Sequence, residues 1–215
     1  MEKGLLVFDL DGTLIDSSAD IALATNRTLE ACGYGALDVE TIKESIGWGV
    51  GMLLERLMPE ETPGAIGAAR EKFLEFYGER LVEDTTLYPG VRETLEYFVE
   101  RGKKMAVVTN KPQALSERIL DEMEMRRFFS MVVGGDTLSN KKPHPEPLVK
   151  VIKTMGFTPG ESVFVGDSPI DCETGKKAGV FTIGVAYGFR PLDELVSAGF
   201  DLLIEKFPEL KDVIK

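Results

Sequence analysis

Two aspartates near the N-terminus, Asp9 and Asp11, have the spacing of an acid pair that could catalyse a reaction or bind a metal ion. They follow the apolar run 5–8, which has the length of a strand buried on both faces, and Gly12 then allows a tight turn. Two carboxylates about 4 Å apart repel each other by roughly 4 kcal/mol at an effective dielectric constant near 20. Such a pair must share a proton or hold a cation, and its oxygen ligands favour Mg²⁺.

Two other interpretations fit an acid pair in a turn. The aspartates could merely cap the turn, and this stretch alone leaves that alternative open. A calcium-binding loop requires glycine at its sixth position, whereas the sixth residue counted from Asp9 is Leu14. The spacing therefore excludes a calcium loop and keeps magnesium as the expected ion.

Polar side chains follow other apolar runs in the same way. Thr109 and Asn110 end one such run, Asp167 ends another, and Lys142 lies in a loop before a helical segment. Open parallel sheets bind ligands at the carboxyl ends of their strands, so we expect these side chains to surround the acid pair. A loop lysine is usually a solvated surface charge. If Lys142 lies beside the acids and the threonine, however, it could offset the negative charge of a phosphate.

The elements that must position these residues alternate between strands and helices. Strands are expected at 5–8, 105–110, 131–136, 163–167 and, more weakly, 181–185, and helices at 91–100, 113–123, 146–155 and 171–178. Alternation of this kind is typical of a parallel sheet covered by helices. The sequence therefore predicts the α/β class: a doubly wound, mainly parallel sheet with a Rossmann-like core.

The segment 17–87 has a different pattern, with no convincing strand. Ser17 or Ser18 is the expected N-cap of its first helix, and further helices are expected at 39–45, 51–58 and 65–81, separated by glycine- or proline-containing breaks. We therefore expect two domains. Residues 1–16 and 88–215 form the α/β catalytic core, and residues 17–87 form an inserted all-helical domain.

The composition of the chain limits the classes of binding partner and the cellular location that we expect. The 215-residue chain carries a net charge of −11 and has no basic stripe, which argues against nucleic acid or an anionic membrane as the main partner. Cys32 and Cys172 are far apart and indicate neither a disulfide framework nor a zinc site. The apolar N-terminal run is too short for a signal peptide or a membrane span. These features predict a cytoplasmic protein with free thiols.

Four motifs occur in an order that resembles the haloacid dehalogenase-like phosphatases. They are DLDGT at 9–13, TN at 109–110, KP at 142–143 and GDSPID at 166–171, so the resemblance covers nearly the whole chain. The helical insert lies where one subgroup of that family carries a helical cap domain. Within that subgroup, the segments 107–112 and 140–148 look most like those of phosphoglycolate phosphatases.

The resemblance implies a mechanism and a metal site. Asp9 is implied to attack phosphorus and form an aspartyl-phosphate, and Asp11 to act as the general acid and then the general base. Magnesium is implied to bind the Asp9 side chain, the Asp11 backbone carbonyl and Asp167. Asp171 is expected to position the motif lysine or a metal-bound water.

The resemblance also implies how substrate is held. Thr109, Asn110 and Lys142 are expected to bind the oxygens of the transferring phosphoryl group. The substrate is expected to be a small phosphorylated metabolite, foremost 2-phosphoglycolate, and the protein a monomer or homodimer. Selection of an acidic substrate requires a cation or amide donors near the cap hinge. The candidate cations in the sequence are Arg27, Lys43, Arg56 and Arg190.

Several alternatives remain open. A sugar phosphatase, a pyrophosphatase or a nucleotidase would share the same motifs. A sugar phosphomutase typically has a histidine early in the cap, and residues 17–24 contain none. A dehalogenase does not need a second acid such as Asp11. A phosphate-accepting signalling domain, the non-enzymatic alternative, would be expected to carry its aspartate at a central strand end where this chain has Thr109.

Overall fold

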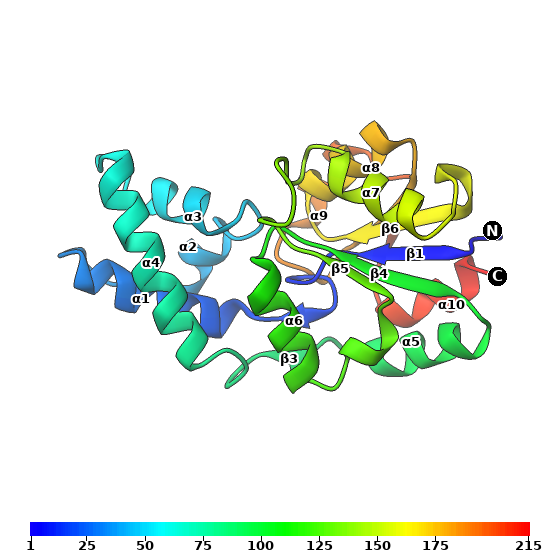
Figure 1. Ribbon diagram of the computed structural model, residues 1–215, viewed down its shortest axis with the longest axis horizontal. Helices are drawn as coiled ribbons and strands as arrows, with labels where there is room; N and C mark the ends of the chain where they lie inside the picture. The colour runs from blue at the N-terminus through cyan, green and yellow to red at the C-terminus, as the bar shows by residue number, and fades with distance from the viewer.

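A six-stranded parallel sheet forms the centre of the protein in the computed structural model, which describes residues 1–215 (Figure 1). The strand order is β5-β4-β1-β6-β7-β8, so β1 lies inside the sheet. The strands are β1 (Leu5–Phe8), β4 (Lys104–Val108), β5 (Met131–Val133), β6 (Ser162–Gly166), β7 (Phe181–Val185) and β8 (Leu202–Ile204). The predicted α/β class is confirmed, and β8 is a strand that the sequence pattern did not reveal.

Helices cover both faces of this sheet (Figure 1). One face is covered by α7 (Glu146–Thr154), α8 (Pro169–Ala178) and α9 (Leu192–Ala198), and the other by α5 (Val91–Glu100), α6 (Gln113–Glu122) and α10 (Leu210–Val213). Three short 3-10 helices occupy Arg126–Phe128, Pro159–Glu161 and Phe207–Glu209.

The apolar strand β1 explains why both faces must be covered. Leu6 and Phe8 pack in the large core that includes α5 and α6, whereas Leu5 and Val7 pack in a second core with α7. All four side chains are fully buried. A strand with apolar side chains on both faces is stable only between two helical layers, as the doubly wound fold provides.

Four helices between β1 and α5 lie beyond the carboxyl ends of the strands, at the left in Figure 1. They are α1 (Ser18–Ala31), α2 (Val39–Lys43), α3 (Val50–Leu57) and α4 (Pro63–Glu79), and they match the helices expected for the insert to within two residues at most boundaries. The most extensive packing within the insert is between α1 and α4. This helical insert therefore lies over the edge of the sheet where the predicted site residues are found.

A two-stranded antiparallel ribbon joins the insert to the sheet. It consists of β2 (Ile15–Asp16) and β3 (Thr86–Leu87), so the expectation of no strand up to residue 87 is wrong at its last two residues. Two-residue strands are too short to show a period-2 pattern. Next to the ribbon, the buried carboxylate of Asp20 accepts hydrogen bonds from the backbone of Asp84 and Thr85, which fastens the two connections together.

Two further observations concern the chain as a whole. Cys32 and Cys172 are both free, as the sequence predicted. None of the helices combines the length and the apolar composition needed to span a bilayer.

Candidate active site

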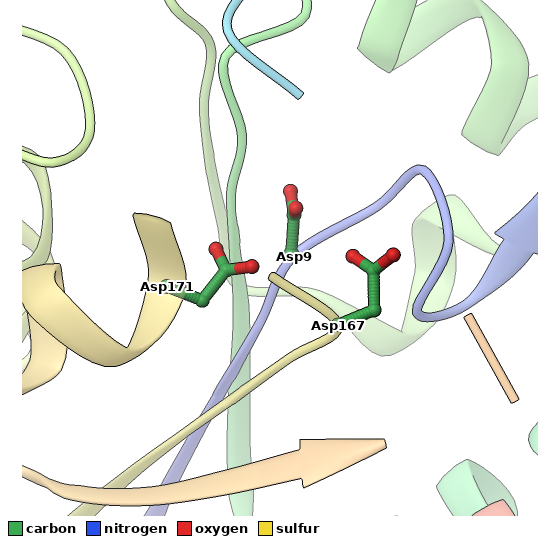
Figure 2. Close-up of side chains that lie close together, drawn as sticks. All are labelled: Asp9, Asp167 and Asp171. Carbon is green, nitrogen blue, oxygen red and sulfur yellow. The ribbon is translucent and has the colours of Figure 1, made fainter. Parts of the chain in front are cut away.

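Three buried carboxylates meet at the carboxyl edge of the sheet, and Figure 2 shows how they lie. Strands β1 and β6 are neighbours, so Asp9 and Asp167, each the first residue after its strand, lie side by side. Asp171 joins them from the first turn of α8. One oxygen of each carboxylate lies within 4.8 Å of the corresponding oxygens of the other two. The sequence-based expectation that these acids converge is met.

The Asp167 carboxylate is held in place by the surrounding backbone. Its Oδ2 accepts a hydrogen bond of 2.7 Å from the Phe189 amide, and its Oδ1 lies 3.5 Å from the Thr13 hydroxyl. Gly12 has φ +82°, and a Cβ on it would collide with this carboxylate. Glycine is required there for both reasons, because other residues rarely adopt that backbone conformation and none would leave room.

Lys142 forms the cationic side of this acidic cluster. Its ammonium lies 2.8 Å from Asp9 Oδ1 and 2.7 Å from Asp171 Oδ1, and its side chain is almost fully buried. Burial lowers the pKa of Lys142, but the charges of Asp171 and Asp9 outweigh burial, and the net effect is a raised pKa. Lys142 therefore carries a full positive charge next to the two acids.

Both carboxylate oxygens of Asp171 already have partners within the protein. Its Oδ1 binds Lys142, and its Oδ2 accepts hydrogen bonds from the Ser168 amide and hydroxyl at the start of α8. Of the two roles expected for Asp171, this geometry favours positioning Lys142. Asp9 differs, because its Oδ1 binds Lys142 and the Leu10 amide while its Oδ2 accepts no hydrogen bond from the protein.

The electrostatics of the cluster fit a bound cation. Burial raises the pKa of Asp9, an effect that Lys142 opposes and Asp171 reinforces. Burial and the neighbouring acids also raise the pKa of Asp167. The single positive charge of Lys142 therefore does not balance the three buried carboxylates. The atoms that could bind a metal ion in this cluster are all oxygens, the ligands that Mg²⁺ prefers. The site could hold a divalent metal ion, and Asp9 Oδ2 is a carboxylate oxygen there that accepts no hydrogen bond from the protein.

This excess of buried acid leads to a prediction about stability. Without metal, folded Asp167 keeps its proton at pH values where unfolded aspartate has lost it. The unfolded state then binds fewer protons, so the free energy of unfolding falls as the pH rises from about 4 to about 8, the pKa of folded Asp167. Mg²⁺ is expected to reverse the loss, by roughly 2.7 kcal/mol at 100 times its Kd. Thermal unfolding with EDTA or Mg²⁺ across this pH range measures both effects.

Asp167→Asn is the matched variant for that experiment. It removes the carboxylate whose pKa is raised but keeps its shape, so we expect a flatter pH dependence and a much smaller shift with Mg²⁺. An equal Mg²⁺ shift in the variant and the wild type would place the metal elsewhere.

Asp11 faces the insert, and two donors hold it. Its Oδ1 accepts hydrogen bonds of 2.5 Å from the Ser17 hydroxyl and 2.7 Å from the Lys111 ammonium. Ser17 occupies the N-cap position of α1 but makes no capping hydrogen bond, and Ser18 bonds Asp16 instead, so neither serine caps the helix by its side chain. The first turn of the insert is thus connected directly to the acid pair.

Lys111 is a site residue that the sequence reasoning missed. Its side chain is only 4% exposed, although lysine is usually a surface residue. Burial is the largest effect and lowers the pKa of Lys111, but Asp11 and Tyr77 together outweigh it, so the net pKa is raised and the ammonium stays charged. The available indication was its place in the chain, directly after the predicted site residues Thr109 and Asn110.

Thr109 and Asn110 follow β4, the strand that pairs with β1 on the side away from β6. Both side chains are buried. Asn110 donates from Nδ2 to the carbonyls of Gly47 (2.9 Å) and Lys142 (3.0 Å), and so links the insert to the lysine loop. The Asn110 backbone amide makes no hydrogen bond within the protein and is free for a ligand.

A small cavity of about 50 Å³ lies between the sheet edge and the insert. From the sheet side it is lined by Asp9, Asp11, Thr109, Asn110 and Lys111, and from the insert mainly by Ile21, Ile46, Val50, Leu53, Phe73 and Tyr77. Asp167 and Lys142 do not line the cavity, although both lie beside Asp9. The structure therefore brings all the predicted site residues to one place.

The four cations proposed from the sequence for substrate selection do not line this cavity. Arg27 forms an exposed ion pair with Glu79, and Arg190 donates to the carbonyls of Lys43 and Ile46. Arg56 lies over the ring of Trp48, and Lys43 pairs with Glu40. These four residues were candidates that the sequence could not place, because the direction of each side chain depends on packing.

Buried acids and a lysine meet at the carboxyl edge of a doubly wound sheet, where enzymes of this fold bind their ligands. The model of the haloacid dehalogenase-like hydrolase family matches residues 6–185, and the chain belongs to this family. The motifs that carried the resemblance are those that form the site.

Individual relatives agree with this assignment. The chain is 39% identical over 199 residues to a phosphoglycolate phosphatase of Pseudomonas syringae, covering 88% of this chain and 73% of that one. It is 37% identical over 215 residues to a phosphoglycolate phosphatase of Chromobacterium violaceum, covering 98% and 96%. The crystal structure of a predicted phosphoglycolate phosphatase from Haemophilus somnus superimposes with a TM-score of 0.94 at 31% identity, covering 99% of this chain and 98% of that one.

Proposed function

We propose that this protein is a Mg²⁺-dependent phosphatase that hydrolyses a small phosphate monoester, foremost 2-phosphoglycolate, through an aspartyl-phosphate intermediate. The observation that carries the proposal is the environment of Asp9. Its Oδ1 is fixed by Lys142 and the Leu10 amide, while its Oδ2 is free beside a cavity that Asp11 also lines. The names of the relatives support the choice of substrate.

In the first step, Asp9 Oδ2 forms a bond to phosphorus as the bond from phosphorus to the leaving oxygen breaks. The leaving oxygen takes a proton from Asp11, so an alcohol departs and an aspartyl-phosphate remains. The Thr109 hydroxyl, the free Asn110 amide and the Lys142 ammonium hold the phosphoryl oxygens. These donors are fixed before substrate arrives, which is the arrangement that best stabilises charge in a transition state.

In the second step, Asp11 acts as a base. It takes a proton from a water molecule that attacks phosphorus, the bond from phosphorus to Asp9 breaks, and inorganic phosphate leaves. Asp11 ends the cycle protonated, as the first step requires. Ser17 and Lys111 hold Oδ1 of Asp11, which leaves its Oδ2 for both proton transfers.

Asp9, Asp167 and the backbone carbonyl of Asp11 would hold the magnesium ion. When bound, Mg²⁺ neutralises charge between the anionic substrate and the anionic nucleophile. Asp171 keeps the Lys142 ammonium between itself and Asp9 and so positions a phosphoryl-binding group.

Residues 17–87 act in this proposal as a cap domain, and residues 1–16 and 88–215 as the catalytic core. The β2–β3 ribbon is the connection at which the cap would move. Closure over the cavity excludes water and selects the leaving group. We place the protein in the cytoplasm, where its free thiols stay reduced.

A panel of phosphate esters tests this function. We expect sustained release of phosphate from 2-phosphoglycolate in the presence of Mg²⁺, and little release after chelation. Activity on sugar phosphates, nucleoside monophosphates or pyrophosphate in preference to 2-phosphoglycolate would keep the mechanism and change the substrate. Transfer of a single phosphoryl group per chain, without turnover, would contradict the proposed phosphatase.

A further inference from the structure

Lys111 is the one cationic residue among those that line the cavity. Its ammonium has three hydrogens, and its single hydrogen bond within the protein is to Asp11 Oδ1 at 2.7 Å. In the proposed mechanism Asp11 protonates the leaving oxygen, so Lys111 lies on the leaving-group side of the site. On the phosphoryl side, the proposed mechanism assigns binding of the oxygens to another lysine, Lys142. Two N–H groups of Lys111 are therefore available to the part of the substrate that departs.

Tyr77 of α4 meets Lys111 from the opposite wall. The Lys111 ammonium lies 4.7 Å from the centre of the Tyr77 ring, which orients both side chains. The Tyr77 side chain is 2% exposed, and its hydroxyl has no hydrogen-bond partner in the protein. Burial raises the pKa of Tyr77 to about 12, so the hydroxyl keeps its proton. Burying a donor without a partner costs free energy, and a donor that lines a cavity points to a ligand that accepts a hydrogen bond from it.

The other side chains that the insert contributes to the cavity are apolar, among them Ile46, Leu53 and Phe73. Apart from the backbone of Gly47 and Gly49, Tyr77 is the one polar group that the insert presents to a leaving group there, and Lys111 is the one cation. An ammonium and a phenolic donor side by side match an anion with two acceptor oxygens, which is the chemistry of a carboxylate. A neutral leaving group would leave the ammonium without an anionic partner on that side.

We propose that Lys111 and Tyr77 together bind a carboxylate on the leaving group and so select phosphate esters of short hydroxy acids. This inference rests on the proposed phosphatase function and adds the residues that choose its substrate. Lys111 bridges the substrate carboxylate and Asp11, which fixes the acid next to the oxygen that it protonates. Binding of the correct leaving group then also positions Asp11, the general acid.

A matched pair of substrates tests the inference. In 2-hydroxyethyl phosphate a CH₂OH group replaces the carboxylate of 2-phosphoglycolate and leaves the ester unchanged. We expect Lys111→Met to lower kcat/KM for 2-phosphoglycolate about 10- to 100-fold more than for 2-hydroxyethyl phosphate. Tyr77→Phe should lower the same ratio by about 3- to 10-fold, with the fold intact, because its hydroxyl has no partner to lose. Lys111→Arg should keep part of the preference.

Lys141→Met is the control for loss of charge. Lys141 is close in sequence, but its ammonium binds the Trp48 carbonyl and does not line the cavity. This variant is expected to leave the ratio of the two kcat/KM values unchanged. If Lys111→Met lowers kcat/KM for the two substrates by the same factor, Lys111 only positions Asp11, and the selectivity inference is overturned.

A binding measurement separates this inference from the proposed function. The probe is 3-phosphonopropionate, in which CH₂ replaces the ester oxygen of 2-phosphoglycolate, compared with propylphosphonate, which lacks the carboxylate. Calorimetry in Mg²⁺ should show tighter binding of 3-phosphonopropionate to wild type and loss of that preference in Lys111→Met. Such binding without turnover of any ester would reject the phosphatase and keep the anion site. Equal binding of both probes by wild type would overturn the inference whatever the turnover.

Discussion

Replacing Asp9 with asparagine is expected to lower phosphate release by at least about 10⁴-fold while leaving the fold intact. Asparagine has the same shape, and its Oδ1 can still accept the hydrogen bonds from Lys142 and the Leu10 amide. The amide nitrogen that replaces Oδ2 has no lone pair available to attack phosphorus. The variant therefore removes the nucleophile and leaves the surrounding donors in place. Turnover in Mg²⁺, with circular dichroism as the check on folding, measures the effect.

Two controls make this result specific to the nucleophile. Asp121→Asn removes an exposed carboxylate on α6 and should leave turnover unchanged. In wild type, borohydride reduces an acyl phosphate, so quenching during turnover should modify Asp9 at a peptide that mass spectrometry identifies. Residual activity in Asp9→Asn above about 1% of wild type, with contamination excluded, would mean that water attacks the substrate directly.

The sequence predicts the sheet and the centre of the site because both depend on local patterns. Strands β1 and β6 are apolar runs that end abruptly at Asp9 and Asp167, and a buried strand cannot continue through an acid without a partner. Parallel pairing then brings their ends together without further information. At β1 and β6 the sequence pattern therefore marks both a strand end and a site residue.

Residues whose role depends on packing could not be predicted in the same way. Lys111 is buried only because Asp11, one hundred residues earlier, lies opposite it. Tyr77 falls within a predicted helix, but the side of that helix facing the cavity is set by packing of α4 on α1. Apart from the place of Lys111 directly after Thr109 and Asn110, the sequence does not distinguish these two residues from an ordinary surface lysine and an ordinary core tyrosine.

The Lys142→Met variant is expected to lose both activity and stability. Methionine fills much of the same volume but removes the charge that lies 2.7 Å from Asp171 and 2.8 Å from Asp9. Removing one partner of a buried ion pair costs about 3–5 kcal/mol, because the remaining charge is left without compensation. Turnover should fall by about 10²- to 10³-fold, as when one fixed transition-state donor is lost. Urea unfolding in EDTA measures the stability without interference from bound metal.

The double variant Lys142→Met/Asp171→Asn shows whether the stability loss comes from the pair. The introduced asparagine would still offer an oxygen to the donors on Ser168 but would carry no charge. We expect the double variant to be more stable than Lys142→Met by about 1–3 kcal/mol, the range of coupling between residues in contact. Its turnover should stay low, because the phosphoryl-binding ammonium is still missing. Recovery of activity together with stability would instead mean that Lys142 acts only on the fold, and the phosphoryl group would then need another cation.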